Sequence, residues 1–402
     1  MVKHVNIFLI IIIQILIVGC SKEPINYQKF LTEKNGVYYT NNTNEPYSGP
    51  IFSIYENGKM KEEGTYKKGK RNGYFTFWYE NKIKKKSGSY RDGELFGKWL
   101  YWNEDGEIYL EENFKDGKKD GLFILYENGQ KIREETYNQG RKDGLFIEWN
   151  DGKKKKEGSL KNGYMSGKWT YWNEDGKKYL EENYKDGKKD GLFIEWYLNG
   201  NKGAETNWKN DQKDGLFTEW HENGLIKKEG YLGNYNYKQD KWTYWDEDGK
   251  KYLEEEYKDG EKDGLLIGWY PNGQKSIEEN YKDGKKDGAA YYWYDDGQQK
   301  QRGSFINGLK NGKMIYWYLE GPKWLEENYI NGKKSGLKTG WYPNGRKSIE
   351  QNWKDDKPDG LLKEWYGNGQ IKKEGRFRDG KNIGEWIYFN KDGSIDRLEN
   401  NN

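Results

Sequence analysis

The sequence predicts an all-β fold, an elongated single-layer antiparallel β-meander or solenoid of about fifteen stacked β-hairpin repeats of about 24 residues. Three observations predict it: a glycine that recurs at a nearly constant step, an aromatic and β-branched run after each glycine, and turn residues after each run. The step between these glycines is 24 residues almost throughout, as from 49 to 73 and from 264 to 288. Two steps, from 121 to 144 and from 144 to 167, are 23 residues long. Asp240 takes the place of one glycine, and the others are Gly49, Gly73, Gly97, Gly121, Gly144, Gly167, Gly191, Gly215, Gly264, Gly288, Gly312, Gly336, Gly360 and Gly384.

The first half of each copy is predicted to be a strand followed by a tight turn. Runs such as LFIEWY, AAYYWY and KMIYWY are rich in the aromatic and β-branched residues that suit strands. An Asn-Gly pair, such as Asn272 and Gly273, commonly follows the run. Because a two-residue hairpin turn of the favoured kind needs two positive φ angles, which Asn and Gly tolerate, this pair predicts a two-residue turn.

The second half of each copy is predicted to be a strand that alternates with period two. In the run QKSIEENY, Ile277, Glu279 and Tyr281 are expected on one face of the sheet, while Glu278 and Asn280 are expected on the other. A Lys/Asp/Gly loop such as DGKKDG then returns the chain. Each unit is therefore one β-hairpin.

Stacking of the hairpins is required because a lone two-stranded hairpin is only marginally stable in water. A column of tryptophans is expected to align along one face of the array and to replace a globular core. The same aromatic column is also the candidate binding surface, since aromatic rings with basic neighbours suit sugars or single-stranded nucleic acid. Its members are Trp196, Trp220, Trp269, Trp293, Trp317, Trp341 and Trp365.

The two ends of the chain differ from the repeats. Residues 1–19 are expected to be a lipoprotein signal peptide, because a short apolar run ends in Ile-Val-Gly-Cys, and Cys20 is the expected lipidation site. Residues 20–48 are expected to be a tether with a capping strand near Val37 to Tyr39, ahead of an array over 49–393. Residues 394–402 are polar and expected to be a disordered tail.

Composition argues against an enzyme and against nucleic-acid binding. Lys and Arg number 69 against 66 Asp and Glu, so no strong positive field is expected to attract nucleic acid. His221 is the sole histidine of the predicted mature chain, and the adjacent residues of a Glu pair point to opposite faces of a strand. The Asp-Gly loops suit turns better than calcium sites. We therefore expect no catalytic residue, no metal and no cofactor.

The repeat resembles the variant form of the membrane occupation and recognition nexus (MORN) repeat found in bacterial proteins of the YwqK antitoxin type. The resemblance rests on a glycine, a Trp-Tyr, an Asn-Gly, a Glu pair, a Tyr and a Lys-Asp-Gly in each copy, and it covers nearly the whole predicted mature chain. It implies an extended β-array with a binding or scaffolding role. The sequence departs from the pattern at 81–82, at 210–212 and at 234–240, and the last of these is the expected weak joint of the array.

Together these features predict a non-enzymatic, lipid-anchored protein of the bacterial cell envelope. The lipid would hold it to a membrane, and Ser21 after the lipidated cysteine resembles the signal for passage to the outer membrane or cell surface. Its expected role is a binding or scaffold surface for a protein or glycan partner. The alternative is an antitoxin-like regulator that neutralises a partner toxin, which the family label implies but which export of the chain disfavours.

Overall fold

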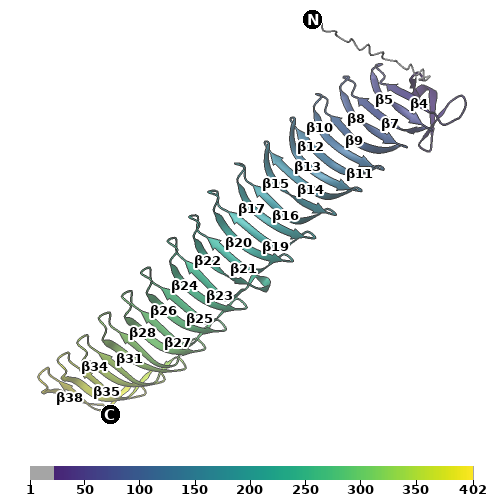
Figure 1. The fold of residues 1–402 in the computed structure, drawn as a ribbon. Helices are drawn as coiled ribbons and strands as arrows, with labels where there is room; N and C mark the ends of the chain where they lie inside the picture. The colour runs from purple at the N-terminus through teal and green to yellow at the C-terminus, as the bar shows by residue number, and fades with distance from the viewer. Residues whose placement is uncertain (1–21, 402) are drawn as a thin grey trace, which may run out of the picture. The chain divides into compact units, whose positions relative to one another are not determined.

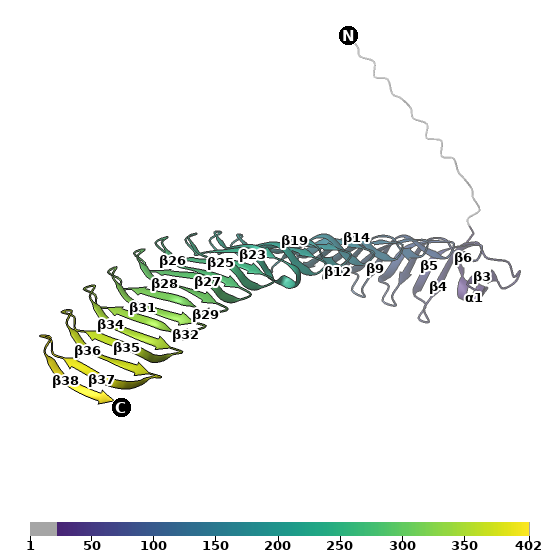
Figure 2. The same ribbon diagram turned by 90° about the horizontal axis from the view of Figure 1, so that it is seen from below.

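The computed structural model describes residues 22–401. The predicted signal peptide, Cys20 and Asn402 lie outside the described residues. The chain divides into two compact units, one ending at Tyr164 and one beginning at Met165. In each unit the strands follow one another in chain order as a single antiparallel layer, which Figures 1 and 2 show as successive rungs. The predicted all-β meander of hairpins is confirmed.

The first unit contains a short N-terminal cap and the first repeats. Its elements are β1 (Ile25–Asn26), α1 (Tyr27–Phe30), β2 (Leu31–Lys34), β3 (Val37–Thr40), β4 (Gly49–Ile54), β5 (Met60–Lys67), β6 (Lys70–Arg71), β7 (Gly73–Trp78), β8 (Lys84–Arg91), β9 (Glu94–Trp102), β10 (Ile108–Lys115), β11 (Lys118–Lys119), β12 (Gly121–Glu127), β13 (Gln130–Asn138), β14 (Arg141–Asn150) and β15 (Lys153–Lys161).

The second unit contains the remaining repeats and one 3-10 turn. Its elements are β16 (Tyr164–Trp172), β17 (Lys178–Lys185), β18 (Lys188–Lys189), β19 (Gly191–Trp196), β20 (Lys202–Lys209), β21 (Gln212–Trp220), β22 (Ile226–Leu232), η1 (Asn234–Asn236), β23 (Lys238–Trp245), β24 (Lys251–Lys258), β25 (Glu261–Trp269), β26 (Lys275–Lys282), β27 (Lys285–Trp293), β28 (Gln299–Ile306), β29 (Leu309–Lys310), β30 (Gly312–Trp317), β31 (Lys323–Ile330), β32 (Lys333–Lys334), β33 (Gly336–Trp341), β34 (Lys347–Lys354), β35 (Lys357–Trp365), β36 (Ile371–Arg378), β37 (Lys381–Phe389) and β38 (Ile395–Asn401).

The predicted two-residue Asn-Gly turn is wrong for most repeats. In the turn after Trp269, Gly273 has a φ of 86° while Asn272 is not left-handed. The N–H of Gly273 donates to the carbonyl of Tyr270, and the N–H of Tyr270 donates to the carbonyl of Gln274, both at 2.8 Å. This is a longer hairpin loop that needs a left-handed residue only at the glycine. The Asn272 side chain instead donates to the carbonyl of Asp295 in the next repeat at 2.5 Å.

The two shorter repeats do contain the predicted turn. Asn128 and Gly129 have φ angles of 50° and 73°, and Asp151 and Gly152 have φ angles of 47° and 73°. Both central residues are therefore left-handed, as a two-residue turn of type I′ requires. The missing residue explains why these two steps are shorter by one than the others.

The two faces of the sheet carry different side chains. We call the face that carries Phe193, Thr206, Trp208 and their counterparts in other repeats the packed face, and the face that carries Leu192, Ile194 and their counterparts the open face. The residues that lie two positions after each recurring glycine, or after Asp240, form the most consistently buried column of the packed face. It includes Ile51, Phe75, Trp99, Phe146, Trp169, Phe193, Trp242, Leu266, Ala290, Met314, Leu362 and Trp386, each at most 8% exposed.

Large rings of this column lie over glycines of the preceding strand. A Cβ on Gly88 would lie 2.2 Å from the Trp99 ring, and a Cβ on Gly375 would lie 2.2 Å from the Trp386 ring. The indole N–H of Trp99 reaches back to the carbonyl of Ser89 at 3.0 Å. Where the preceding strand carries a glutamate in place of the glycine, the residue opposite ranges from Ala290, which faces Glu279, to Phe146, which faces Glu135. Packing between repeats therefore follows a size rule in which tryptophans such as Trp99 and Trp386 lie opposite glycine, since interiors are close-packed.

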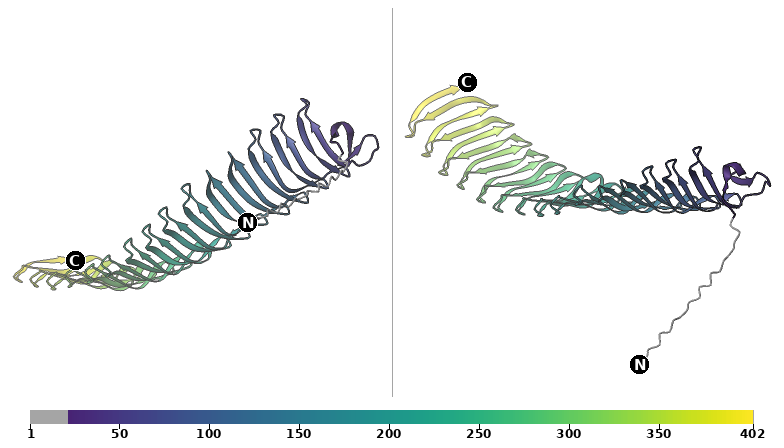
Figure 3. Two further views of the ribbon diagram at one scale, coloured as in Figure 1. Left: turned by 45° about the horizontal axis from the view of Figure 1, so that its top comes forward. Right: turned by 90° about the horizontal axis from the view of Figure 1, so that it is seen from above.

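The N-terminal segment is folded rather than being mainly a tether. The expected capping strand is present as β3, which pairs with β2, and β1 pairs in parallel with the edge strand β4. Tyr38 stacks on Tyr66 with ring centroids 4.9 Å apart, and Tyr27 meets Tyr38 edge to face at 5.6 Å. Figure 3 shows this cap beside the first strands. The polar composition of the segment hides these few aromatic residues, which are enough to bury it.

The predicted disorder of residues 394–402 is also contradicted over the part that the structure describes. Residues Ile395–Asn401 form β38, which pairs with β37. The side chains of β38 are mostly exposed. Backbone pairing accounts for the order, because the edge of β37 offers N–H and C=O groups that a polar strand satisfies as well as an apolar one.

Candidate binding surfaces

The seven predicted tryptophans occupy equivalent places in the second unit. Each is the last residue of a first strand and is half-buried, and each hairpin has a register shift just before this residue. Alternation along β19 puts Trp196 on the open face, opposite Phe193. The tryptophan column is thus distinct from the buried column, which the sequence reasoning did not single out. The signal was present, because the second residue after the recurring glycine is apolar in nearly every copy.

Each tryptophan of the column is held by the repeat before it. The Lys178 ammonium lies 3.8 Å from the centroid of the Trp196 ring and 3.0 Å from the Glu181 carboxylate. The Tyr270 hydroxyl donates to the carbonyl of Trp293 at 2.8 Å. Comparable cation–π contacts cover Trp220, Trp269, Trp293, Trp317 and Trp341. One side of these rings is therefore already occupied by a cation, and their use by a ligand stays a prediction.

His221 fills the position that tyrosine takes in the sibling repeats. Its Nε2 lies 3.0 Å from the carbonyl of Trp245, which is the bond that a tyrosine hydroxyl makes elsewhere. His221 is therefore a structural substitute for tyrosine in the column of inter-repeat hydrogen bonds.

The second glutamate of each pair forms a buried ionic cluster on the packed face. Glu279 is 2% exposed and accepts hydrogen bonds from Lys286, from Tyr292 and, at 2.7 Å, from Tyr281. Burial alone would raise the pKa of Glu279, but the hydrogen bonds from these donors outweigh it and hold the pKa below its usual value. Burial, and then the hydrogen bond to Glu279, raises the pKa of Tyr281 to about 12.

The expectation that the two residues of a Glu pair point to opposite faces is confirmed here. Glu278, on the open face, pairs with Lys275 at 2.7 Å, and its side chain is 25% exposed. The sequence alone indicates solvated glutamates that pair across strands with lysines, and Glu279 does pair with Lys286. The burial of Glu279 and its two tyrosine partners were not predicted.

A groove of about 610 Å³ lies on the packed face of the second unit, over β17 to β21. Its aromatic lining includes Phe193, Trp208 and Phe217. Its charged lining consists of Glu182, Lys189, Glu195, Lys213 and Glu219. At this repeat the buried glutamate is replaced by Thr206, which is 7% exposed. The Thr206 hydroxyl and the Trp208 indole nitrogen are buried without a hydrogen-bond partner.

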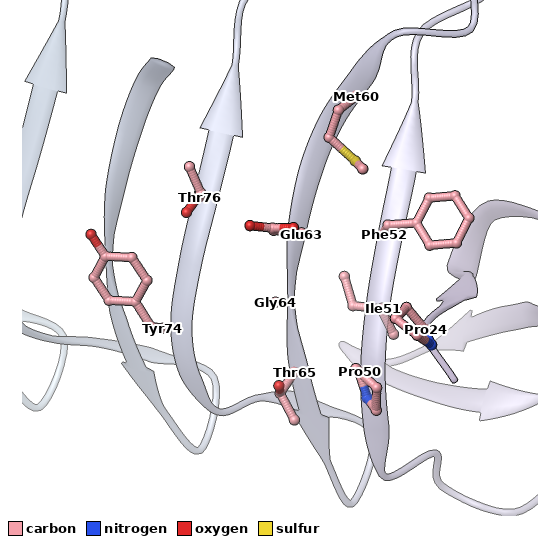
Figure 4. A pocket seen from close by; sticks show the side chains of 10 residues that line it. All are labelled: Pro24, Pro50, Ile51, Phe52, Met60, Glu63, Gly64, Thr65, Tyr74 and Thr76. Carbon is pink, nitrogen blue, oxygen red and sulfur yellow. The ribbon is translucent and has the colours of Figure 1, made fainter. Parts of the chain in front are cut away.

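Another cavity, of about 510 Å³, lies on the first repeats of the first unit. Figure 4 shows its side chains on β4, β5 and β7. Phe52, Met60 and Tyr74 give it an apolar lining beside Glu63 and Thr76. Among the described lining residues, none has a buried polar atom without a partner. The cavity therefore offers shape but no distinctive chemistry.

Over residues 22–401, no three His, Cys, Asp or Glu side chains gather as metal ligands would. The helices within the same range are too short to cross a membrane.

An all-β array of hairpins in which each repeat contacts its neighbours belongs to the class of repeat proteins. The family of the MORN repeat variant matches this chain four times, at residues 48–68, 165–186, 262–283 and 358–379. The chain therefore contains repeats of the MORN variant. No curated protein matches the sequence.

The solved structures that are similar are only distantly so. The crystal structure of TcdB2-TccC3 is 12% identical, with 87% of this chain and 21% of that chain covered and a TM-score of 0.17. The structure of the Photorhabdus luminescens Tc holotoxin pore is 12% identical, with 87% of this chain and 20% of that chain covered and a TM-score of 0.15. The crystal structure of CbpF in complex with ipratropium is 15% identical, with 92% of this chain and 98% of that chain covered and a TM-score of 0.10. This chain spans about a fifth of the first of these proteins, and scores this low contribute nothing to the functional argument.

Proposed function

We propose that this chain is a non-enzymatic, lipid-anchored protein of the bacterial cell envelope whose open face binds a protein or glycan partner. The observation that carries the proposal is a set of exposed leucines on that face. The residue that follows the recurring glycine is Leu216, Leu337 or Leu361 in three repeats of the second unit, at 54%, 43% and 40% exposure. The same place is taken by lysine or glutamate in other repeats, at Lys168, Lys241, Lys313 and Glu385. Apolar groups that recur on an exposed surface favour an interaction site.

The neighbouring groups support the same conclusion. On the open face these apolar residues alternate with Lys–Glu pairs such as Lys202–Glu205 at 2.6 Å and Lys347–Glu350 at 2.5 Å. Half-buried tryptophans end the same strands. An apolar centre with a polar, charged surround is the usual composition of a protein interface.

The binding proposal is tested by removing the exposed leucines. A variant that combines Leu216→Ser, Leu337→Ser and Leu361→Ser is immobilised and exposed to detergent-solubilised envelopes of the producing bacterium. The variant should retain several-fold less envelope material than the wild type. Leu198→Ser, at a turn residue that is 65% exposed, is the control and should change nothing. Equal retention by the triple variant and the wild type would refute an open-face site, and retention of a toxin would favour the antitoxin-like alternative.

The membrane anchor is tested at Cys20, which lies outside the described residues. The full-length chain and Cys20→Ala are expressed with a clickable fatty acid. Label should be incorporated into the wild type alone, because the variant has no thiol to acylate. Label that persists in Cys20→Ala would refute lipidation at Cys20.

A further inference from the structure

The repeat that spans Gly191 to Asp214 lacks the carboxylate that its own donors are arranged to bind. In a regular repeat the buried carboxylate accepts from a lysine and a tyrosine. Glu327 accepts from Lys334 at 2.8 Å and from Tyr329 at 2.8 Å. Glu255 repeats this arrangement, with Lys262 at 2.6 Å and Tyr257 at 2.6 Å.

Three substitutions distinguish the groove repeat. Thr206 stands where the glutamate would be, Trp208 stands where the tyrosine would be, and Ala204 takes a place that is leucine at Leu180. The column lysine, Lys213, is kept. Thr206 and Ala204 are smaller than the glutamate and leucine of sibling repeats, and the space that they leave is consistent with a groove at this point.

Lys213 differs from the other column lysines of the second unit. Lys189, Lys262, Lys286 and Lys334 pair with glutamates, and Lys238 and Lys310 donate to tyrosine hydroxyls. The described contacts of the Lys213 ammonium are with rings, those of Trp208 at 5.7 Å and Phe217 at 5.6 Å. A half-buried ammonium without a polar partner favours an anion at that place.

Two buried donors point to the same ligand group. Thr206 and Trp208 line the groove, and the hydroxyl of the first and the indole N–H of the second are buried without a hydrogen-bond partner. Buried donors of this kind are normally satisfied, so their presence beside Lys213 indicates a group that accepts from all three. A carboxylate has the charge and the lone pairs to do so.

The other groove residues indicate what the part of the ligand beyond its carboxylate should be. Phe193, Trp208 and Phe217 offer apolar ring surfaces, on which the face of a sugar ring can pack. Glu195 lines the groove and is exposed, so its carboxylate is available to accept from hydroxyl groups. A simple aromatic acid has no hydroxyl for Glu195, whereas an acidic sugar has several.

We infer that the groove around Thr206 is a binding site for an acidic sugar, whose carboxylate is held by Lys213, Thr206 and Trp208. This goes beyond the open-face binding function proposed above, because the groove lies on the packed face and has a ligand class of its own. It also accounts for Thr206, which breaks the buried glutamate column without supplying a large ring or a glycine in its place.

The test uses trigalacturonate as the probe, with purified full-length protein in detergent and calorimetry as the readout. Thr206→Glu should weaken binding roughly tenfold or more, because the variant supplies the internal carboxylate that sibling repeats carry. Lys213→Gln should weaken binding to a similar extent. Both variants should keep the far-ultraviolet circular dichroism of the wild type, since glutamate already stands at this position in regular repeats.

Matched controls come from the repeat that spans Gly336 to Asp359. There Gln351 replaces the glutamate and Trp353 replaces the tyrosine, but Pro358 replaces the column lysine. Gln351→Glu introduces the same kind of charge outside the groove and should leave the affinity unchanged. This control separates loss of the site from a general effect of an added carboxylate.

Two further ligands test the chemistry. The methyl ester of trigalacturonate, which keeps the ring and loses the charge, should bind at least tenfold more weakly than the acid. Benzoate, which keeps the carboxylate and loses the hydroxyls, should also bind more weakly.

Four outcomes would overturn the inference: no measurable binding of trigalacturonate, equal binding of its ester, equal binding of benzoate, or an affinity that Thr206→Glu leaves unchanged. Thr206→Glu leaves the open-face leucines intact, so retention of envelope material by this variant tests the proposed function separately.

Discussion

At the residue scale, the buried glutamate of each regular repeat links two adjacent hairpins. Glu279 lies on β26, whereas Lys286 and Tyr292, which donate to it, lie on β27. Breaking a buried pair by removing one partner is costly, because the other charge is left behind. A substitution in this cluster is therefore expected to alter contacts in both of the hairpins that it links.

Glu279→Gln should lower the free energy of unfolding by roughly 1–3 kcal/mol, because the charged hydrogen bonds to Lys286 are lost. The control is Glu278→Gln, which breaks the exposed pair with Lys275 and should cost less than about 1 kcal/mol. Urea unfolding at pH 7 measures both. Equal costs would show that burial adds nothing to the inner carboxylate.

The same clusters predict a stability plateau between acidic and alkaline limits. The pKa values of Glu255, Glu279 and Glu327 lie below their usual value, since hydrogen bonds from lysine and tyrosine outweigh burial. Their contribution is present above the unfolded pKa of about 4.3 and is lost as the pH falls through the lower folded pKa. The pKa of Tyr281 is raised to about 12, so its contribution is present below its unfolded pKa of about 10 and is lost as the pH rises towards 12.

The measurement is the urea midpoint as a function of pH. It should fall below about pH 4 and again above about pH 10. In Glu279→Gln the acid decline should be shallower than in the wild type. A midpoint that is the same at pH 3 and pH 7 would contradict the role given to the carboxylates.

At the element scale, neighbouring strands are matched by size. Gly375 lies under the Trp386 ring, and Gly88 lies under the Trp99 ring in the same way. Where a glutamate replaces the glycine, the residue opposite is no larger than phenylalanine, as the pairs Glu279–Ala290 and Glu135–Phe146 show. A strand is thus specified by its neighbour as well as by its own propensity.

Gly375→Ala should be destabilising by roughly 1–3 kcal/mol, because the added methyl overpacks the contact with Trp386. Gly367→Ala, in the same repeat, meets nothing within 4 Å and is not left-handed, so it should be neutral or slightly stabilising. Combining Gly375→Ala with Trp386→Phe should recover part of the loss. Thermal unfolding of the three variants decides the matter, and an equal effect of the two alanines would refute the size rule.

The irregular junction at 234–240 is confirmed as a departure from the repeat. It contains η1, and Tyr235, Asn236 and Asp240 have positive φ angles of 61°, 65° and 54°. Asp240 holds the left-handed conformation that glycine takes at Gly264 and Gly288, and such a conformation is less favourable for any residue with a Cβ.

We expect amides at 234–240 to exchange hydrogen faster than amides at the regular loop 282–287, because the irregular loop opens more readily. Asp240→Gly should slow exchange at the junction several-fold and leave 282–287 unchanged. Native proteolysis should first cut between Tyr235 and Lys241. Equal protection of the two loops in the wild type would exclude a weak joint here.

At the scale of the whole molecule, each repeat of a unit contacts mainly the repeats beside it. The N–H of Gly308 donates to the carbonyl of Lys286 at 2.7 Å, and the N–H of Gly332 donates to the carbonyl of Lys310 at 2.8 Å. In such an array stability is approximately a sum of repeat and neighbour terms. Removing one complete repeat should therefore leave the others folded.

Two deletions, each of one complete repeat, test both the array and its size rule. Removal of 264–287 brings Glu255 against Ala290, the residue that Glu279 faces in the native chain, and should be well tolerated. Removal of 288–311 brings Glu279 against Met314, which native packing places against Gly303, and should cost more stability. A deletion of half a repeat removes one strand and should be the most damaging. Equal thermal midpoints for the three deletions would contradict the neighbour rule.

The sequence by itself determined the architecture. Its period identified the repeat, the strand runs located the hairpins, and alternation along a strand separated Glu278 from Glu279. These features are local, because turn chemistry and strand periodicity depend on residues a few positions apart. The shorter step at 121 to 144 even indicated the shorter turn at Asn128 and Gly129.

Only the tertiary structure decided which face is packed, what the inner glutamate does and where the groove lies. Burial of Glu279 depends on Lys286 and Tyr292 of the next strand, and the fit of Trp386 depends on the absence of a side chain at Gly375. The groove arises because Thr206 and Trp208 are set beside Lys213 with no carboxylate between them. These properties belong to contacts between strands, and no single strand carries them.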